Sequence, residues 1–173
     1  GDLVTPPGWL LPTHHLDVRI RMSESAPKPL GHNVLVDFYS GAAQIPAKTR
    51  ILGAEAIEPG EEGWAQLVLA KPTALVAQDR FIIRQPSPSL TLGGGVVVDP
   101  HPRRRHRRFR PAVVERLERI AGGSPEEVVL GLLASGPLKV RALLERSHLE
   151  PQVVEEALEV LLDRSQVSLL GSE

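Results

Sequence analysis

The spacing of apolar residues changes once along this chain, and the change separates two kinds of structure. Up to about residue 100 apolar residues recur at every second position, as in the stretch from Leu16 to Met22, which is the period of a half-buried strand. After Arg110 they recur at helical spacing, as in Val113, Leu117 and Ile120. The chain is therefore expected to hold an all-β part followed by a mostly helical part.

The β part is expected over residues 15–100. The same alternation of apolar and polar residues returns at 34–38 and 65–69, and turn signals such as Pro59-Gly60 separate the runs. About half a dozen short strands with no helical pattern between them predict an antiparallel barrel or sandwich.

The helical part is expected over residues 111–173. The first helix begins at Pro111 and ends before Gly122-Gly123, and the second begins at Ser124 with a capping box to Glu127. A third helix holds Val140 to Leu144, and a fourth begins near Pro151. The closing "SQVSLLGSE" then resembles the start of a β-wing that is cut short, so these residues predict a winged-helix unit.

Composition excludes several classes of protein. There is no cysteine, so disulfides, a thiolate zinc site and a cysteine nucleophile are ruled out. Aromatic residues make up only 3%, which disfavours base-stacking platforms. No apolar run approaches the roughly 20 residues of a membrane span, and we expect a cytoplasmic protein. The chain begins at Gly1 without methionine, so we interpret it as a fragment of a longer protein.

Positive charge is concentrated in ten residues. Residues 1–100 hold 8 Lys and Arg against 10 Asp and Glu, residues 101–110 hold 6 against none, and residues 111–173 hold 6 against 11. We describe residues 101–110 as an arginine-rich hinge that is either a solvated linker or a phosphate contact. The second alternative rests on the planar guanidinium, which suits phosphate. The candidate residues for this phosphate contact are Arg103, Arg104, Arg105, Arg107 and Arg108.

Candidates for catalysis are weak. The segment Ala42 to Thr49 has the outline of a phosphate-binding loop, but alanines replace its glycines and Pro46 removes a main-chain N–H that the loop needs. His14-His15 point to opposite faces of an extended chain and do not make a metal site. No paired carboxylates or nucleophile motif stand at a useful spacing. We therefore expect no enzymatic activity, no bound metal and no cofactor.

The helical unit is a poor candidate for reading DNA. Its last helix carries acidic residues where a DNA reader needs basic or amide side chains, and the phosphate backbone would repel them. Those residues are Glu150, Glu155, Glu156, Glu159 and Asp163. Lys139 and Arg141, in the preceding helix, are the better candidates for an RNA contact. The alternative function of a transcription regulator, with a barrel sensor and a winged helix, is thereby disfavoured.

Three stretches carry a resemblance to a known family. They are "PLGHNVLVDFYSGAAQIPAKTRIL", "EPGEEGWAQLVLAKP" and "DRFIIRQPSPSLTLGGGVVVDPHP". The last resembles the third domain of bacterial selenocysteine-specific elongation factors (the SelB family), whose scaffold is the domain III barrel of the general factor EF-Tu. Residues 1–14 resemble the end of the preceding domain, and residues 111–173 resemble the first winged helix of the C-terminal part.

The resemblance implies a function and a set of RNA-binding residues. The parent protein would deliver selenocysteinyl-tRNA to the ribosome, and its third domain would grip the tRNA backbone. GTP and Mg²⁺ would bind an N-terminal domain, and the mRNA hairpin would bind C-terminal winged helices, neither of which is in this chain. The fragment would couple these parts, as a monomer and away from membranes. By resemblance, the residues to test in the barrel are Arg80, Arg84, Thr91, Gly93 and Gly94.

Overall fold

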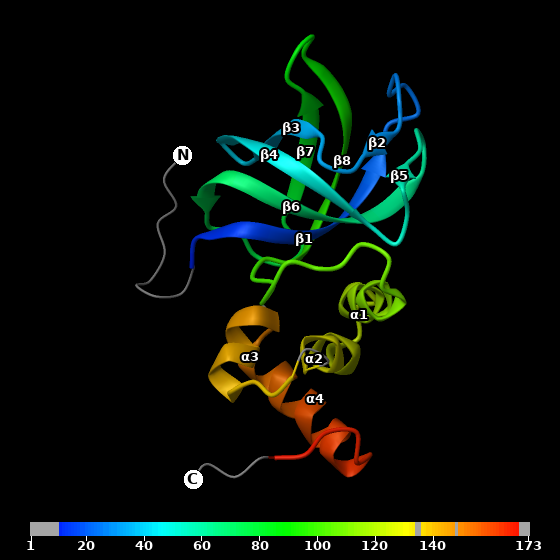
Figure 1. The fold of residues 1–173 in the computed structure, drawn as a ribbon. Coiled ribbons are helices and arrows are strands. Elements are labelled where there is room, and N and C mark those ends of the chain that lie inside the picture. Colours follow the sequence, from blue (N-terminus) through cyan, green and yellow to red (C-terminus); the bar gives the residue numbers. More distant parts are fainter. Residues whose placement is uncertain (1–10, 134–135, 148, 170–173) are drawn as a thin grey trace. The chain divides into compact units, whose positions relative to one another are not determined.

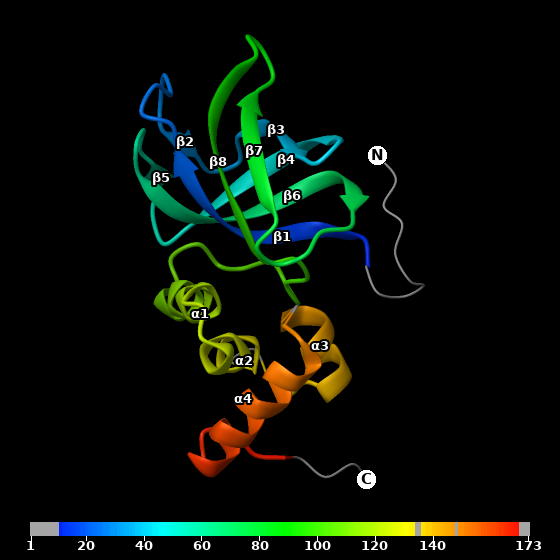
Figure 2. The same cartoon turned by 180° about the vertical axis from the view of Figure 1, so that it is seen from behind.

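The computed structural model describes residues 11–133, 136–147 and 149–169. The strands run in the order β1 (Thr13–Met22), β2 (Leu30–Gly31), β3 (Leu35–Ser40), β4 (Ala43–Leu52), β5 (Ala56–Ile57), β6 (Glu62–Thr73), β7 (Arg80–Gln85) and β8 (Leu90–Asp99). They are followed by the helices α1 (Pro111–Ala121), α2 (Pro125–Leu133), α3 (Val140–Ser147) and α4 (Pro151–Asp163). Figures 1 and 2 show this succession from two sides.

Six strands close an antiparallel barrel in the order β1-β6-β4-β3-β7-β8, and β8 pairs back with β1. The short strands β2 and β5 pair separately. Closing the sheet leaves no unpaired edge among the barrel strands, which removes the usual site of edge-to-edge aggregation. The prediction of an antiparallel barrel built from alternating strands is therefore confirmed.

The apolar positions predicted from the alternation fill the barrel. Leu16, Val18, Ile20 and Met22 of β1 are at most 1% exposed. In the same interior the rings of Phe38 and Phe81 stack with their centroids 5.2 Å apart. With so few aromatic residues in the chain, aliphatic side chains make up most of this core, and it forms one continuous cluster.

One row of side chains breaks the expected alternation of buried and exposed positions. Asp99, Asp17, Gln66 and Arg50 are neighbours across β8, β1, β6 and β4, on the side of the strands away from the core. They are nevertheless buried, with Asp17, Asp99 and Gln66 0% exposed and Arg50 7% exposed. The chain that follows β8 covers them, and we call these four residues the polar row.

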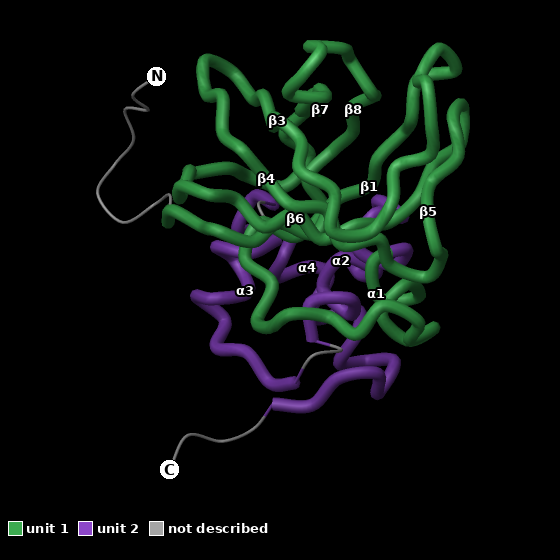
Figure 3. Tube along the Cα trace, turned by 45° about the horizontal axis from the view of Figure 1, so that its top comes forward, with its two compact units in different colours: residues 1–117 green, residues 118–173 purple. Residues whose placement is uncertain are grey.

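The chain divides into two compact units, residues 1–117 and 118–173 (Figure 3). The sequence places the boundary at the hinge of residues 101–110, whereas this division lies inside α1, at Leu117. The difference has a physical cause, because residues 104–116 are bonded to the barrel through the polar row. Most of the segment expected to end a preceding domain, residues 1–10, lies outside the described residues.

The second unit has its own apolar core. Buried side chains come from each of its helices, among them Val129 and Leu132 of α2, Leu143 of α3 and Leu161 of α4. The Ser124 hydroxyl accepts a hydrogen bond from the Glu127 N–H at 3.1 Å, as its capping position predicts. The four-helix region is thus confirmed. The expected wing stays a prediction: residues 165–169 form no strand, and Leu170 to Glu173 lie outside the described residues.

Candidate functional site

The outer face of β1, β8 and β7 carries a group of cationic side chains. On β7, Arg80, Ile82 and Arg84 alternate with the buried Phe81 and Ile83 and so point outward. Across the sheet, Val96 lies between Arg80 and Arg19, and Gly94 lies between Ile82 and Arg21. Two of the predicted arginines therefore share a face with two arginines of β1.

A shallow groove of about 480 Å³ lies on this face. It brings together three of the predicted residues, Arg80, Gly93 and Gly94, and adds Arg21, which the sequence analysis did not select. Arg21 contacts Glu62 at 3.3 Å, but both side chains are about half exposed or more, so solvent weakens this pair. The groove thus presents two arginines beside the main chain of three glycines, and Glu24 also lines it. We call it the glycine groove.

Arg84 and Thr91 lie opposite each other on β7 and β8. Thr91 is exposed. The guanidinium carbon of Arg84 lies 5.9 Å from the centre of the Tyr39 ring, and the Arg84 Nε is buried without a hydrogen-bond partner. Stacking on the ring holds Arg84 against the barrel and leaves part of its donor capacity unused.

The three glycines are required by the barrel itself. A Cβ atom at Gly93 or Gly95 would overlap the main-chain oxygen of Arg21 or Arg19, and one at Gly94 would lie 2.6 Å from the oxygen of Phe81. By resemblance, Gly93 and Gly94 are candidate RNA-binding residues. The structure gives a separate reason for the glycines, because β8 lies too close to β1 and β7 for any side chain.

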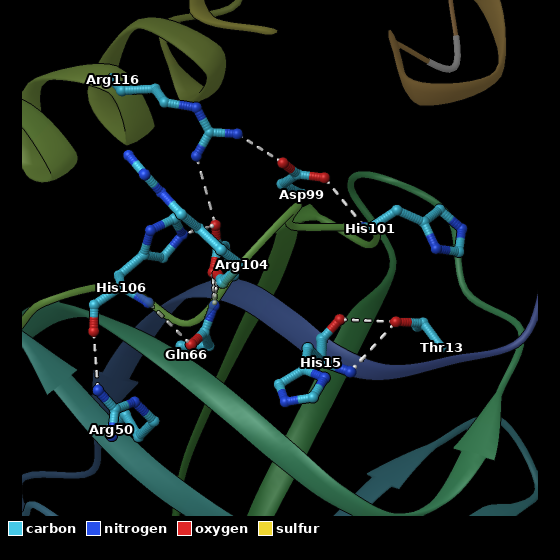
Figure 4. A network of polar contacts seen from close by, with 10 residues as sticks. Thr13, His15, Arg50, Gln66, Asp99, His101, Arg104, His106 and Arg116 are labelled. Carbon is cyan, nitrogen blue, oxygen red and sulfur yellow. Dashed lines mark hydrogen bonds and ion pairs between the residues drawn. The ribbon is translucent and has the colours of Figure 1, made fainter. Parts of the chain in front are cut away.

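A second group of polar residues lies at the polar row, where α1 and the 101–110 segment meet the barrel strands (Figure 4). Arg116 of α1 donates to Asp99 at 2.6 Å and contacts Asp17 at 3.5 Å. The His106 Nε2 lies 2.7 Å from Asp17 Oδ2, the same oxygen that Arg116 contacts. Burial raises the pKa of Asp17, while the hydrogen bond and charge of His106 and the charge of Arg116 hold it down.

Gln66 connects the same row to the main chain of the arginine tract. Its amide nitrogen donates to Asp17 Oδ1 at 3.0 Å and to the Arg104 carbonyl at 3.2 Å, and its oxygen accepts from the His106 N–H at 3.3 Å. Arg50 donates to the His106 carbonyl at 2.7 Å. These bonds fix residues 104–106 against the outer surface of the barrel, and none of them was predicted from the sequence.

The predicted arginines of the tract differ in their surroundings. Arg103, Arg104, Arg105 and Arg107 are exposed, although the Arg104 carbonyl is bonded to Gln66 of the barrel. Arg108 is half-buried, and its guanidinium donates to the carbonyls of Ile51, Ala54 and Glu55. It also lies over the ring of Phe109, 4.6 Å from its centre. The tract is thus anchored along one side and presents arginine side chains on the other.

Lys139 and Arg141, the candidates in the second unit, are exposed. Arg141 contacts Glu145 at 3.1 Å across one helical turn, an exposed pair of small energetic value. Glu150, which precedes α4, and the acidic residues of α4 at positions 155, 156, 159 and 163 are all exposed. This agrees with the expectation that α4 is unsuited to DNA.

The structure also bears on the sites that the sequence analysis disfavoured. Residues 43–49, in the segment that has the outline of a phosphate-binding loop, belong to β4. This strand pairs with β3 and β6, so its main-chain amides are used in the sheet. Among the residues that the structure describes, no group of three potential ligands could hold a metal ion. Over the same residues no helix has the length and apolar character to cross a bilayer.

Two comparisons with known proteins bear on this site. The sequence model of the β-barrel domain of selenocysteine-specific elongation factor matches residues 17–104, which is about half of the chain. The chain is also 30% identical over 164 residues to a selenocysteine-specific elongation factor from Desulfomicrobium baculatum. That alignment covers 93% of this chain and 26% of the relative, so the chain spans about a quarter of the relative's length.

Proposed function

Because the chain belongs to the family of the selenocysteine-specific elongation factor β-barrel domain, we propose that it binds the backbone of selenocysteinyl-tRNA through the outer face of its barrel. The chain is part of a translation elongation factor of this kind, and the proposal concerns what this part does. The glycine groove carries the proposal, since it places Arg21 and Arg80 beside main chain that lacks side chains.

The chemistry of the face suits a sugar-phosphate backbone better than bases. Arginines supply counter-charge and forked donors to phosphate oxygens, and the described face has no exposed aromatic pair on which bases could stack. Such contacts position a nucleic acid without reading its sequence. We therefore expect binding that depends strongly on salt and weakly on the sequence of the tRNA stem.

The helical unit is proposed to couple this barrel to the parts of the parent protein that read the mRNA hairpin. Lys139 and Arg141 are its proposed RNA contacts, and the ribosome is a further proposed partner. We propose that this chain has no catalytic activity and binds no cofactor, that GTP and Mg²⁺ bind elsewhere in the parent, and that the protein is a cytoplasmic monomer. The alternative of a DNA-binding regulator conflicts with the acidic surface of α4.

The experiment compares binding of selenocysteinyl-tRNA and duplex DNA by fluorescence anisotropy over a series of salt concentrations. Arg80→Ala should weaken tRNA binding about 10-fold, the value of one charge-assisted hydrogen bond, and reduce the salt slope by about one unit. Lys71→Ala, an exposed cation on β6 outside the groove, is the matched control. Tighter salt-dependent binding to duplex DNA would favour the regulator instead.

The arginine tract is tested in the same assay. If its exposed side chains contact phosphate, replacing Arg103, Arg104 and Arg105 by alanine should lower the salt slope by up to about three units. An unchanged slope would show that these side chains only solvate the connection between barrel and helices.

A further inference from the structure

Arg50, the end of the polar row on β4, is a buried cation with an incomplete set of partners. It is 7% exposed, one nitrogen donates to the His106 carbonyl at 2.7 Å, and its Nε is buried without a hydrogen-bond partner. No carboxylate of the described chain lies within ion-pair distance of it. A buried guanidinium without a counter-ion destabilises the folded protein.

Burial and the charges of two further cations, Arg105 and Arg108, lower the pKa of Arg50. Arg108 is held in place by three main-chain carbonyls and contacts the Glu55 carboxylate at 3.4 Å. Glu55 is 86% exposed, so it neutralises this group only weakly. Arg105 is exposed and lies on the segment that Arg50 itself fastens to the barrel.

His32 completes the group from the loop after β2. This loop is fixed beside β4, because the Asn33 N–H donates to the Thr49 carbonyl at 2.7 Å and the Thr49 hydroxyl donates to the Gly31 carbonyl at 2.8 Å. The Nδ1 of His32 is buried without a partner. Burial, and then Arg108, Arg50 and Arg105, lower the pKa of His32, while Glu55 opposes them.

The contacts within the protein account for only part of this arrangement. Fastening of the arginine tract explains one nitrogen of Arg50, and the carbonyls of residues 51–55 explain the position of Arg108. They do not explain why three guanidinium groups, which repel one another, gather beside an unpartnered imidazole nitrogen. An anion with several acceptor oxygens would offset that repulsion and use the spare donors.

We propose that Arg50, Arg105, Arg108 and His32 form a phosphate-binding site, and that its occupant is a phosphodiester of bound RNA. The assignment to RNA rests on the proposed function, whereas the anion site itself does not. It involves β4, the loop after β2 and the arginine tract, so none of its residues belongs to the glycine groove on β1, β7 and β8. The RNA backbone would then contact the barrel at two separate places.

The first experiment titrates the whole chain with inorganic phosphate and follows the His32 ring by NMR. Saturable shifts of the His32 signals are expected, with a rise in the His32 pKa because the bound anion favours the imidazolium form. Arg105→Ala should weaken phosphate binding about 10-fold. Because Arg105 is exposed, this variant does not threaten the fold.

Lys48→Ala is the matched control, since Lys48 is an exposed cation on the same strand as Arg50. Its phosphate affinity should equal that of the unchanged protein. Absence of saturable shifts, or equal weakening by Lys48→Ala and Arg105→Ala, would overturn the site. His32→Gln provides a second test, because it should weaken phosphate binding most at low pH, where the imidazole of the unchanged protein is protonated.

The second experiment adds selenocysteinyl-tRNA and follows the same His32 signals. If tRNA perturbs the His32 signals and excess inorganic phosphate reverses this change, the result would support RNA as the occupant of the site. If tRNA binds and leaves His32 unperturbed, the assignment of the site to RNA is wrong although the protein binds tRNA. If phosphate binds and tRNA does not bind at all, the proposed function fails while the anion site stands.

Discussion

At the scale of single residues, packing against neighbouring main chain decides what a side chain may be. Gly93, Gly94 and Gly95 of β8 lie against the main chain of β1 and β7, and an added methyl group would first meet carbonyl oxygens rather than movable side chains. Because these glycines have no side chains, their main chain forms part of the surface of the glycine groove. One constraint of the barrel thus creates the surface on which the proposed RNA contact depends.

Gly95→Ala should therefore destabilise the barrel before it affects RNA. Its Cβ would overlap the Arg19 oxygen and lie 3.0 Å from the Phe81 ring, and overpacking of this kind costs about 3 kcal/mol. The free energy of unfolding is measured by urea denaturation. Gly31→Ala is the control, since its Cβ would meet only Val34 at an ordinary 3.6 Å. A stable Gly95→Ala variant that lost tRNA binding would instead assign the glycine to RNA alone.

At the scale of elements, the connection after β8 belongs to the barrel. The main chain of residues 104–106 is bonded to the polar row, and the first turns of α1 supply Arg116 to the two buried carboxylates. Paired charges at this depth add little to stability over apolar residues, but removal of one partner is costly. The polar row therefore acts as a polar fastening: it holds residues 104–116 to the barrel, and its charged groups depend on one another.

Arg116→Met tests this fastening. It leaves Asp17 and Asp99 buried without their guanidinium, so the free energy of unfolding should fall by about 3 to 5 kcal/mol. The pKa of Asp17, already raised by burial, would rise further. A protein loses stability as pH rises from the ordinary pKa of such a carboxyl to its raised value in the folded state. The loss caused by Arg116→Met should thus be smaller in acid, near the ordinary carboxyl pKa of about 4, than at neutral pH.

The control for Arg116→Met is Arg110→Met, an exposed arginine just before the same helix. It should change stability by less than about 0.5 kcal/mol. A loss for Arg116→Met as small as this, or one independent of pH, would contradict the fastening. Adding Asp17→Asn to Arg116→Met should recover part of the stability, because a neutral amide replaces the uncompensated charge.

At the scale of the whole molecule, two compact units each hold a core of their own. The second comprises residues 118–173, a size at which a domain is only marginally stable. Trp64 lies on β6 in the first unit, whereas α2, α3 and α4 lie in the second. Fluorescence and the helical circular dichroism signal therefore report on different units.

Leu161→Ala, in the core of the second unit, should lower the stability of that unit by about 2 to 5 kcal/mol. Leu161 is 0% exposed. The midpoint of the helical signal in urea should fall while the tryptophan transition stays in place. Leu67→Ala, equally buried in the barrel, should have the opposite effect. Coincident shifts of both signals in both variants would show that the two units unfold as one.

The sequence determined most of what depends on local pattern. Alternation at period two predicted the strands of a barrel and which side chains fill it, and helical spacing with Pro, Ser and Gly at the ends predicted the four helices. Arg80 and Arg84 were selected by the family resemblance, and their spacing agrees with one outward face, since residues four apart on a strand share a side. The same reasoning could have found Arg19 and Arg21 on β1, which the alternation places outward.

Only the tertiary structure decided which outward residues stay in contact with solvent. Asp17 alternates like Arg19 and Arg21, and nothing in its local pattern predicts that a segment 89 residues later in the chain covers it. The polar row, the anchoring of the arginine tract and the grouping of His32 with Arg50, Arg105 and Arg108 all arise from such distant pairings. Periodicity reports the direction of a side chain, whereas burial and charge depend on what the fold brings to it.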